Sequence, residues 1–100
     1  MTLEEVKALF QTDELQELCR QNGVARLSVF GSTARNEANE QSDLDLLVSF
    51  SKSIGLWDFI AFEDKLAEAT KHKVDLVSEG ALSPHRSESI LRDLQVIYEA

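Results

Sequence analysis

The spacing of apolar residues alternates along the chain between a helical period and a strand period. Thr2, followed by Glu5 three residues later, has the pattern of a capping box that opens a helix. The apolar residues of this helix share one face: Leu3, Val6, Leu9 and Phe10. A second helix is predicted from Asp13 to Asn22-Gly23, where glycine permits a left-handed exit. Two amphipathic helices are therefore expected before the first strand.

Two apolar runs have the period of β-strands. Residues 25–30 form the first, which ends at Gly31-Ser32, and residues 44–50 form the second. Because side chains alternate along a strand, one face of the second strand is apolar, with Leu44, Leu46, Val48 and Phe50. Asp43 and Asp45 must then share the other face, and a helical turn or two starting near Thr33 joins the strands.

The second half of the chain is predicted to contain a helix, a strand and a final helix. Residues 57–70 suit a helix that packs on a sheet, and residues 73–77 suit a third strand. Ser83-Pro84 offers a cap and a first-turn proline for the last helix. The apolar stripe of that helix is expected to run to the C-terminus: Ile90, Leu91, Leu94, Ile97 and Tyr98.

These elements predict an α/β (α+β) fold with a small mixed three-stranded sheet, in a single domain of residues 1–100. If Gly31-Ser32 and Asp43 serve one site, the first two strands must be antiparallel. A helical crossover makes the second and third strands parallel, so the order is 1-2-3 with helices flanking the sheet. Asp75 would then lie beside Asp43 and Asp45, and three carboxylates would converge at one edge.

Composition narrows the classes of partner and compartment. A net charge of −8 without a basic stripe argues against direct nucleic-acid binding. No apolar run approaches the roughly 20 residues of a membrane span, so no membrane contact is expected. The first residues lack the pattern of a signal peptide, and the single Cys19 cannot form an internal disulfide. We therefore expect a cytoplasmic protein.

The three aspartates predict a magnesium site. Adjacent carboxylates repel one another, and Mg²⁺ is usually bound by a few carboxylates together with substrate phosphates. A nucleoside triphosphate would supply those phosphates. Gly31-Ser32 can offer backbone N–H groups and a hydroxyl to phosphate oxygens, and Arg35 is close enough along the chain to add a cationic clamp.

Three segments carry a resemblance to a known family. They are Gly31-Ser32-Thr33-Ala34-Arg35, Ser42-Asp43-Leu44-Asp45-Leu46-Leu47-Val48 and Val74-Asp75-Leu76-Val77. Their sequence and spacing resemble the polymerase-beta-type nucleotidyltransferase superfamily over nearly the whole chain. The similarity is greatest to its smallest branch, the minimal nucleotidyltransferase (MNT) antitoxins encoded beside HEPN-type ribonuclease toxins.

The resemblance implies transfer of AMP from ATP to a tyrosine of the toxin, which silences it, within a complex of the two proteins. By the same resemblance, Asp43 and Asp45 bind two Mg²⁺ ions, and Asp75 completes one metal site and helps to activate the acceptor hydroxyl. Nucleotide binding falls to four residues: Gly31, Ser32, Arg35 and Ser42.

Two positions depart from the family pattern. Asn36 stands where glycine is usual, and Asn39 stands where a second arginine is frequent. Asparagine tolerates left-handed backbone angles, so we expect Asn36 to preserve a turn. Asn39 removes a positive charge, which bears on triphosphate affinity or on the geometry of the acceptor.

Three other functions compete with this prediction. A binding module of the same fold could neutralise a toxin by contact alone. Modification of a small molecule such as an aminoglycoside would need an additional substrate domain, and an Asp-x-Asp phosphatase would need a threonine where Leu47 stands. His85 and Arg86, in the first turn of the last helix, could touch an acceptor or simply be solvated.

Overall fold

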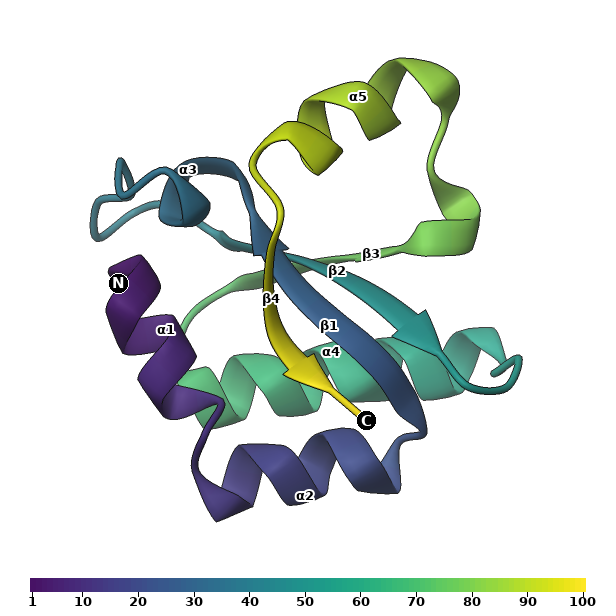
Figure 1. The fold of residues 1–100 in the computed structure, drawn as a ribbon. Helices are drawn as coiled ribbons and strands as arrows, with labels where there is room; N and C mark the ends of the chain where they lie inside the picture. The colour runs from purple at the N-terminus through teal and green to yellow at the C-terminus, as the bar shows by residue number, and fades with distance from the viewer.

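The computed structural model describes residues 1–100, apart from the side chains of His85 and Arg86. Helices and strands alternate along most of the chain, as Figure 1 shows. In chain order the elements are α1 (Leu3–Leu9), α2 (Asp13–Gln21), β1 (Val24–Phe30), α3 (Gly31–Ala34), β2 (Leu44–Phe50), α4 (Leu56–Thr70), β3 (Val74–Ser78), the 3₁₀ turn η1 (Glu79–Ala81), α5 (Pro84–Arg92) and β4 (Gln95–Glu99).

The sheet is mixed and contains four strands in the order β3-β2-β1-β4. β1 and β2 are antiparallel, and β2 and β3 are parallel. The predicted order and directions of the first three strands are therefore confirmed. The three-stranded sheet is corrected to four, because β4 pairs antiparallel with the outer edge of β1.

The predicted helix to the C-terminus ends instead at Arg92, and residues 95–99 form β4. An uncovered edge of β1 would leave a row of backbone N–H and C=O groups unpaired, and β4 satisfies that row. Val96, Ile97 and Tyr98 are residue types that favour strands. Ile97 and Tyr98 are both buried although adjacent, beside an irregularity in the register with β1. This pair broke the strand alternation and prolonged the helical spacing.

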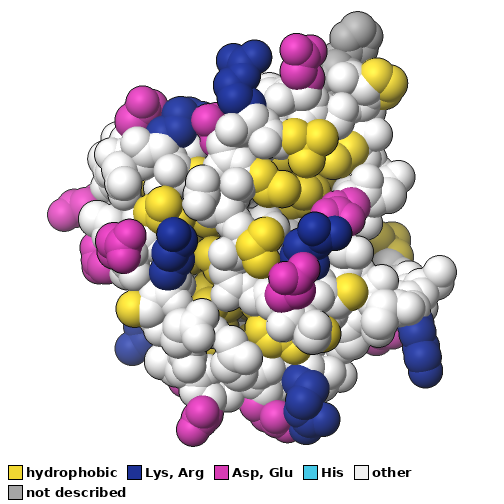
Figure 2. All heavy atoms as spheres, viewed as in Figure 1, with side chains coloured by type: hydrophobic (Ala, Val, Ile, Leu, Met, Phe, Trp, Pro, Cys, Tyr) yellow, Lys and Arg dark blue, Asp and Glu magenta, His cyan; other side chains and the backbone are white. Residues whose placement is uncertain are grey.

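Three helices cover one face of the sheet and α5 lies over the other (Figure 1). The larger hydrophobic cluster joins α1, α2 and α4 to the sheet, and its fully buried side chains include Phe10, Leu15, Leu46 and Phe62. The cluster under α5 has three buried members: Phe30, Leu47 and Ile90. Figure 2 shows hydrophobic side chains at the surface between α5 and the sheet.

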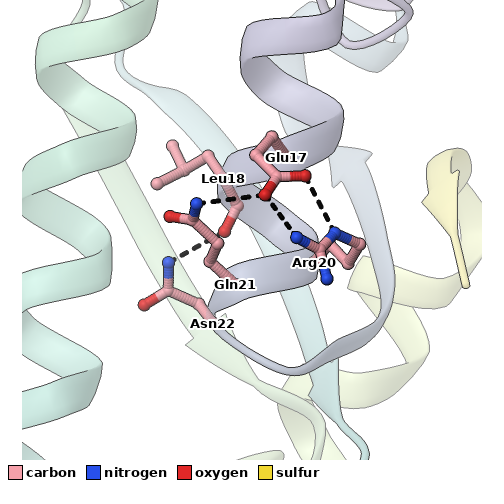
Figure 3. Close-up of polar contacts among 5 residues, drawn as sticks. All are labelled: Glu17, Leu18, Arg20, Gln21 and Asn22. Atoms are coloured by element: carbon pink, nitrogen blue, oxygen red, sulfur yellow. Dashed lines mark hydrogen bonds and ion pairs between the residues drawn. The ribbon is translucent and has the colours of Figure 1, made fainter.

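Local hydrogen bonds define the two N-terminal helices. Thr2 accepts from the backbone N–H of Glu5, while the Glu5 carboxylate accepts from the N–H of Thr2, so the predicted capping box is present. At the end of α2, Glu17 binds Arg20 and Gln21 (Figure 3). The side-chain amide of Asn22 donates to the carbonyl of Leu18, 2.8 Å away, which also accepts from the backbone N–H of Asn22, and Gly23 then turns the chain.

Helix α4 is attached to the free edge of β3 by one side chain. The Glu63 Oε2 atom accepts a hydrogen bond of 2.9 Å from the backbone N–H of Leu76. Cys19 is buried in the large cluster, and its burial raises the pKa of the thiol to about 12. No helix in the described part of the chain is long and apolar enough to cross a membrane.

Candidate active site

The polar face of β2 lies on the α5 side of the sheet. Leu44, Leu46 and Val48 belong to the large core cluster, whereas Leu47 belongs to the cluster under α5. Because side chains alternate along a strand, Asp45 shares the face of Leu47. The sequence-based assignment of Asp45 to the face opposite the core is therefore confirmed.

Asp45 stands in the middle of a row that crosses three strands. Its Cα pairs with Phe30 of β1 on one side and with Asp75 of β3 on the other. Register partners in neighbouring strands direct their side chains to the same face. The structure thus brings Asp45 and Asp75 together as nearest cross-strand neighbours, as the topology predicted.

Gly31 lies directly against Asp45. It has a φ of +72°, and a Cβ atom at this position would overlap Oδ2 of Asp45 and lie 3.3 Å from its Cγ. Only glycine combines this backbone angle with this close approach. Gly31 and Ser32 begin α3, so the glycine-serine turn and the Asp45 carboxylate belong to one site.

Asp43 and Ser42 precede β2 in a short loop. The N–H of Leu44 donates to the carbonyl of Lys73 at 2.8 Å, which places Asp43 at the entrance of the β2–β3 pair. Ser42 Oγ accepts from the N–H of Asn39 at 3.1 Å, and the Asn39 side chain accepts from the N–H of Gln41 at 2.8 Å. Asn39 therefore organises the loop that leads to Asp43.

Asn36 has the left-handed conformation that the sequence predicted, with a φ of +59°. Its Oδ1 atom also accepts a hydrogen bond of 3.0 Å from the backbone N–H of Leu3, at the start of α1. A glycine would keep the backbone angle and lose this contact. Asn36 thus links the turn after α3 to the N-terminal helix.

Arg35 is engaged by two carboxylates. Its Nη1 atom lies 2.9 Å from Oδ2 of Asp93, and its Nε atom lies 3.1 Å from Oε2 of Glu37. These hydrogen bonds, the one with Asp93 above all, raise the pKa of the guanidinium. Arg35 thereby joins the segment after α3 to the turn between α5 and β4. A role in holding a triphosphate would require it to leave these partners.

The donor set fits Mg²⁺ in its chemistry. The carboxylates of Asp45 in β2 and Asp75 in β3 belong to one cross-strand row, and Asp43 directly precedes β2. Among the described side chains, no group of three His, Cys, Asp or Glu residues is arranged to hold a metal ion. The expected nest of three converged aspartates is thus not formed by the side chains alone. Mg²⁺ commonly binds one or two carboxylates and takes its other ligands from water and substrate phosphates.

A cavity of about 700 Å³ adjoins the site on the β3 side. Asp75 is part of its lining, together with the start of α4, the end of β2 and η1. Neither this cavity nor the contact of Glu63 with β3 could be predicted from the sequence, since neither leaves a motif. His85 and Arg86, named as possible acceptor contacts, have side chains outside the described residues.

Known proteins resemble the chain in sequence and structure. The model of the family described as "Nucleotidyltransferase domain" matches residues 13–97. The protein adenylyltransferase MntA of Thermococcus cleftensis is 37% identical over 94 residues, which are 94% of each protein. A solved minimal nucleotidyltransferase is 40% identical, with a TM-score of 0.78 over 95% of each chain.

A more distant solved structure has the same fold. It is the complex of a tri-AMPylated HEPN toxin of Shewanella oneidensis with an MNT antitoxin, matched at 18% identity and a TM-score of 0.69, over 99% of this chain and 74% of the other. The family model, the sequence identity to MntA and the approach of Gly31 to Asp45 beside Asp75 all indicate the same family. The chain belongs to the nucleotidyltransferase domain family, among the minimal nucleotidyltransferases related to protein adenylyltransferases.

Proposed function

We propose that the chain transfers AMP from ATP to a tyrosine hydroxyl of a cognate HEPN-type toxin in the cytoplasm, and that this transfer silences the toxin. The observation that carries the proposal is that Asp45 pairs with Asp75 across β2 and β3, while Gly31, directly after β1, lies against the Asp45 carboxylate. The name of the Thermococcus relative and the AMPylated toxin in the Shewanella complex support the choice of group and acceptor.

Each part of the row has a chemical role in this proposal. Gly31 and Ser32 offer N–H groups and a hydroxyl to the triphosphate. Asp43, Asp45 and Asp75 would hold two Mg²⁺ ions, which supply positive charge to the phosphate oxygens when bound. The acceptor oxygen attacks the α-phosphorus, the bond to pyrophosphate breaks, and the Asp75 carboxylate takes the hydroxyl proton. The protein mainly positions the reactants and offsets charge.

The test compares two Asp→Asn substitutions. Asp45→Asn should lower the rate of AMP transfer from labelled ATP by at least about a hundredfold, because one group that offsets transition-state charge is lost. Asp64→Asn, an exposed position of α4 on the other side of the sheet, is the matched control and should transfer at the parental rate. Chelation of divalent ions should stop transfer, and added Mg²⁺ should restore it.

The competing function, neutralisation by contact alone, gives a different result. It predicts that the parental chain inhibits its toxin without labelling it, and that Asp45→Asn inhibits equally well. Parental transfer by Asp45→Asn would contradict the assigned role of the row. Both experiments need the toxin's ribonuclease activity to be measured beside the label.

A further inference from the structure

The cavity lies beside β3, on the far side of Asp45 from Gly31, and Asp75 is the one site residue in its lining. In the row, Gly31 and Ser32 follow β1, Asp45 lies in β2, and Asp75 lies in β3. If the triphosphate lies at Gly31-Ser32, the leaving pyrophosphate is on the β1 side of the reacting phosphorus. In-line displacement requires the attacking oxygen to approach from the opposite side, which is the side of Asp75.

The lining of the cavity suits an aromatic side chain that bears a hydroxyl. Its lining includes the apolar residues Ile54, Leu56 and Phe59, which belong to α4 and the loop before it. Asp75 belongs to the same lining, and by the register with Asp45 its side chain lies on the α5 side of the sheet. An aromatic ring would bury apolar area against α4, with its polar end at the edge of β3 that carries Asp75. The volume of about 700 Å³ lies within the range of ligand cavities.

The cavity continues into an exposed apolar surface at the start of α4. Leu56 is 68% exposed, Trp57 is 80% exposed and Ile60 is 38% exposed, and these are three of the five large exposed hydrophobic residues among the described side chains. Such residues gathered on one helix mark a protein contact more often than residues scattered singly. Tryptophan in particular contributes strongly to protein interfaces.

Charge restricts the partner further. The charged residues of the lining are Asp75, Glu79 and Lys52, which sum to one negative charge, and the whole chain carries −8. A segment with basic residues around its acceptor side chain would be attracted to this surface, and an acidic segment would be repelled.

We propose that this cavity and the adjoining residues Leu56 and Trp57 are the acceptor-docking site, which receives a basic segment of the partner protein and directs its aromatic hydroxyl to Asp75. The inference rests on the proposed function, because the direction of attack follows from nucleotidyl transfer. It adds the surface that recognises the acceptor and the chemistry of the segment that fits there.

The experiment measures AMP transfer to the HEPN-type toxin of the proposed function, used as a ribonuclease-inactive variant. Leu56→Glu should raise the KM for this acceptor at least tenfold and leave the KM for ATP unchanged. Trp57→Ala should also raise the KM for the acceptor. Val96→Glu is the control, since Val96 is 45% exposed on β4, at the opposite edge of the sheet, and should leave both constants within twofold.

Each other outcome overturns a different statement. An unchanged acceptor KM in both Leu56→Glu and Trp57→Ala would exclude the docking site while leaving the proposed function intact. A raised KM for ATP alone would assign the cavity to the nucleoside. A parental chain that is dimeric in solution and becomes monomeric with Leu56→Glu would assign the surface to a second copy. Absence of label from the parental chain itself would refute the proposed function, and the docking site with it.

Discussion

The two faces of the sheet are made by the same strands and differ in what covers them. On one face, α1, α2 and α4 bury a cluster of sixteen side chains, among them Phe10, Leu46 and Phe62. On the other, α5 covers three buried residues and leaves the row of Asp45 and Asp75 only partly buried. Neighbouring residues of β2 therefore face different surroundings: Leu46 belongs to the core, and Asp45 belongs to the site to which we assign the chemistry.

The face under α5 also contains a buried polar group that lacks a hydrogen bond among the described residues. Ser28, which alternates with the core residues Leu27 and Val29, has its hydroxyl buried without a hydrogen-bond partner among the described residues. Asp45 and Asp75 occupy strand positions where apolar residues would add burial. A domain of this size can carry charged groups on one face of its sheet because the large hydrophobic cluster on the other face supplies most of the buried apolar area.

The largest difference between the two faces is expected when adjacent residues of β2 are substituted. Leu46→Ala removes a fully buried side chain from the large cluster and should lower the free energy of unfolding by about 2–5 kcal/mol. Asp45→Asn, one residue earlier, should leave that free energy unchanged or slightly higher, because it removes a negative charge beside Asp75. Urea unfolding of both variants measures the difference. Equal losses in the free energy of unfolding would show that the two faces contribute equally to stability.

The next largest effect is expected at Gly31, where a substitution should lower both the stability and the rate of AMP transfer. Gly31→Ala introduces a Cβ that overlaps the Asp45 carboxylate at a φ of +72°, and such strain costs about 1–3 kcal/mol. Displacement of Asp45 by 1 Å would lower transfer by up to about a hundredfold. Thermal unfolding and the labelling assay measure the two effects.

Gly23→Ala is the matched control for this prediction. Gly23 has nearly the same φ, +70°, and its nearest side-chain neighbour, Ser51 Oγ, would be 3.7 Å from the new Cβ. The control should therefore lose stability and retain transfer. If Gly31→Ala also transferred at the parental rate, the contact between Gly31 and Asp45 would have no part in the chemistry.

Much of the fold and the site could be predicted because local patterns were sufficient. Alternation in residues 44–50 placed Asp45 opposite the core, and the long helix before β3 made the crossover parallel, which brought Asp75 to Asp45. The left-handed turn at Asn36 followed from the tolerance of asparagine for that conformation. These are properties of short segments and of chain direction.

What could not be predicted depends on contacts between distant segments. The apolar spacing of residues 95–99 continues that of α5 and predicts a helix, and only the unpaired edge of β1 decides in favour of a strand. The partners of Arg35 and Glu63 lie 58 and 13 residues away along the chain. Side-chain pairing at such separations leaves no pattern in a single sequence.

The smallest effect is expected at Arg35, and it tests whether this residue belongs to the nucleotide-binding site. Since the guanidinium donates to Asp93 and Glu37, Arg35→Gln should loosen the turn between α5 and β4 and lower Tm by a few degrees at most, because exposed ion pairs contribute little. The KM for ATP should change by less than about threefold, and Asp93→Asn, which removes the same pair from its other end, should match it. A large rise in the KM for ATP in Arg35→Gln, absent from Asp93→Asn, would contradict this expectation. It would show that Arg35 exchanges its carboxylate partners for the triphosphate and takes part in nucleotide binding.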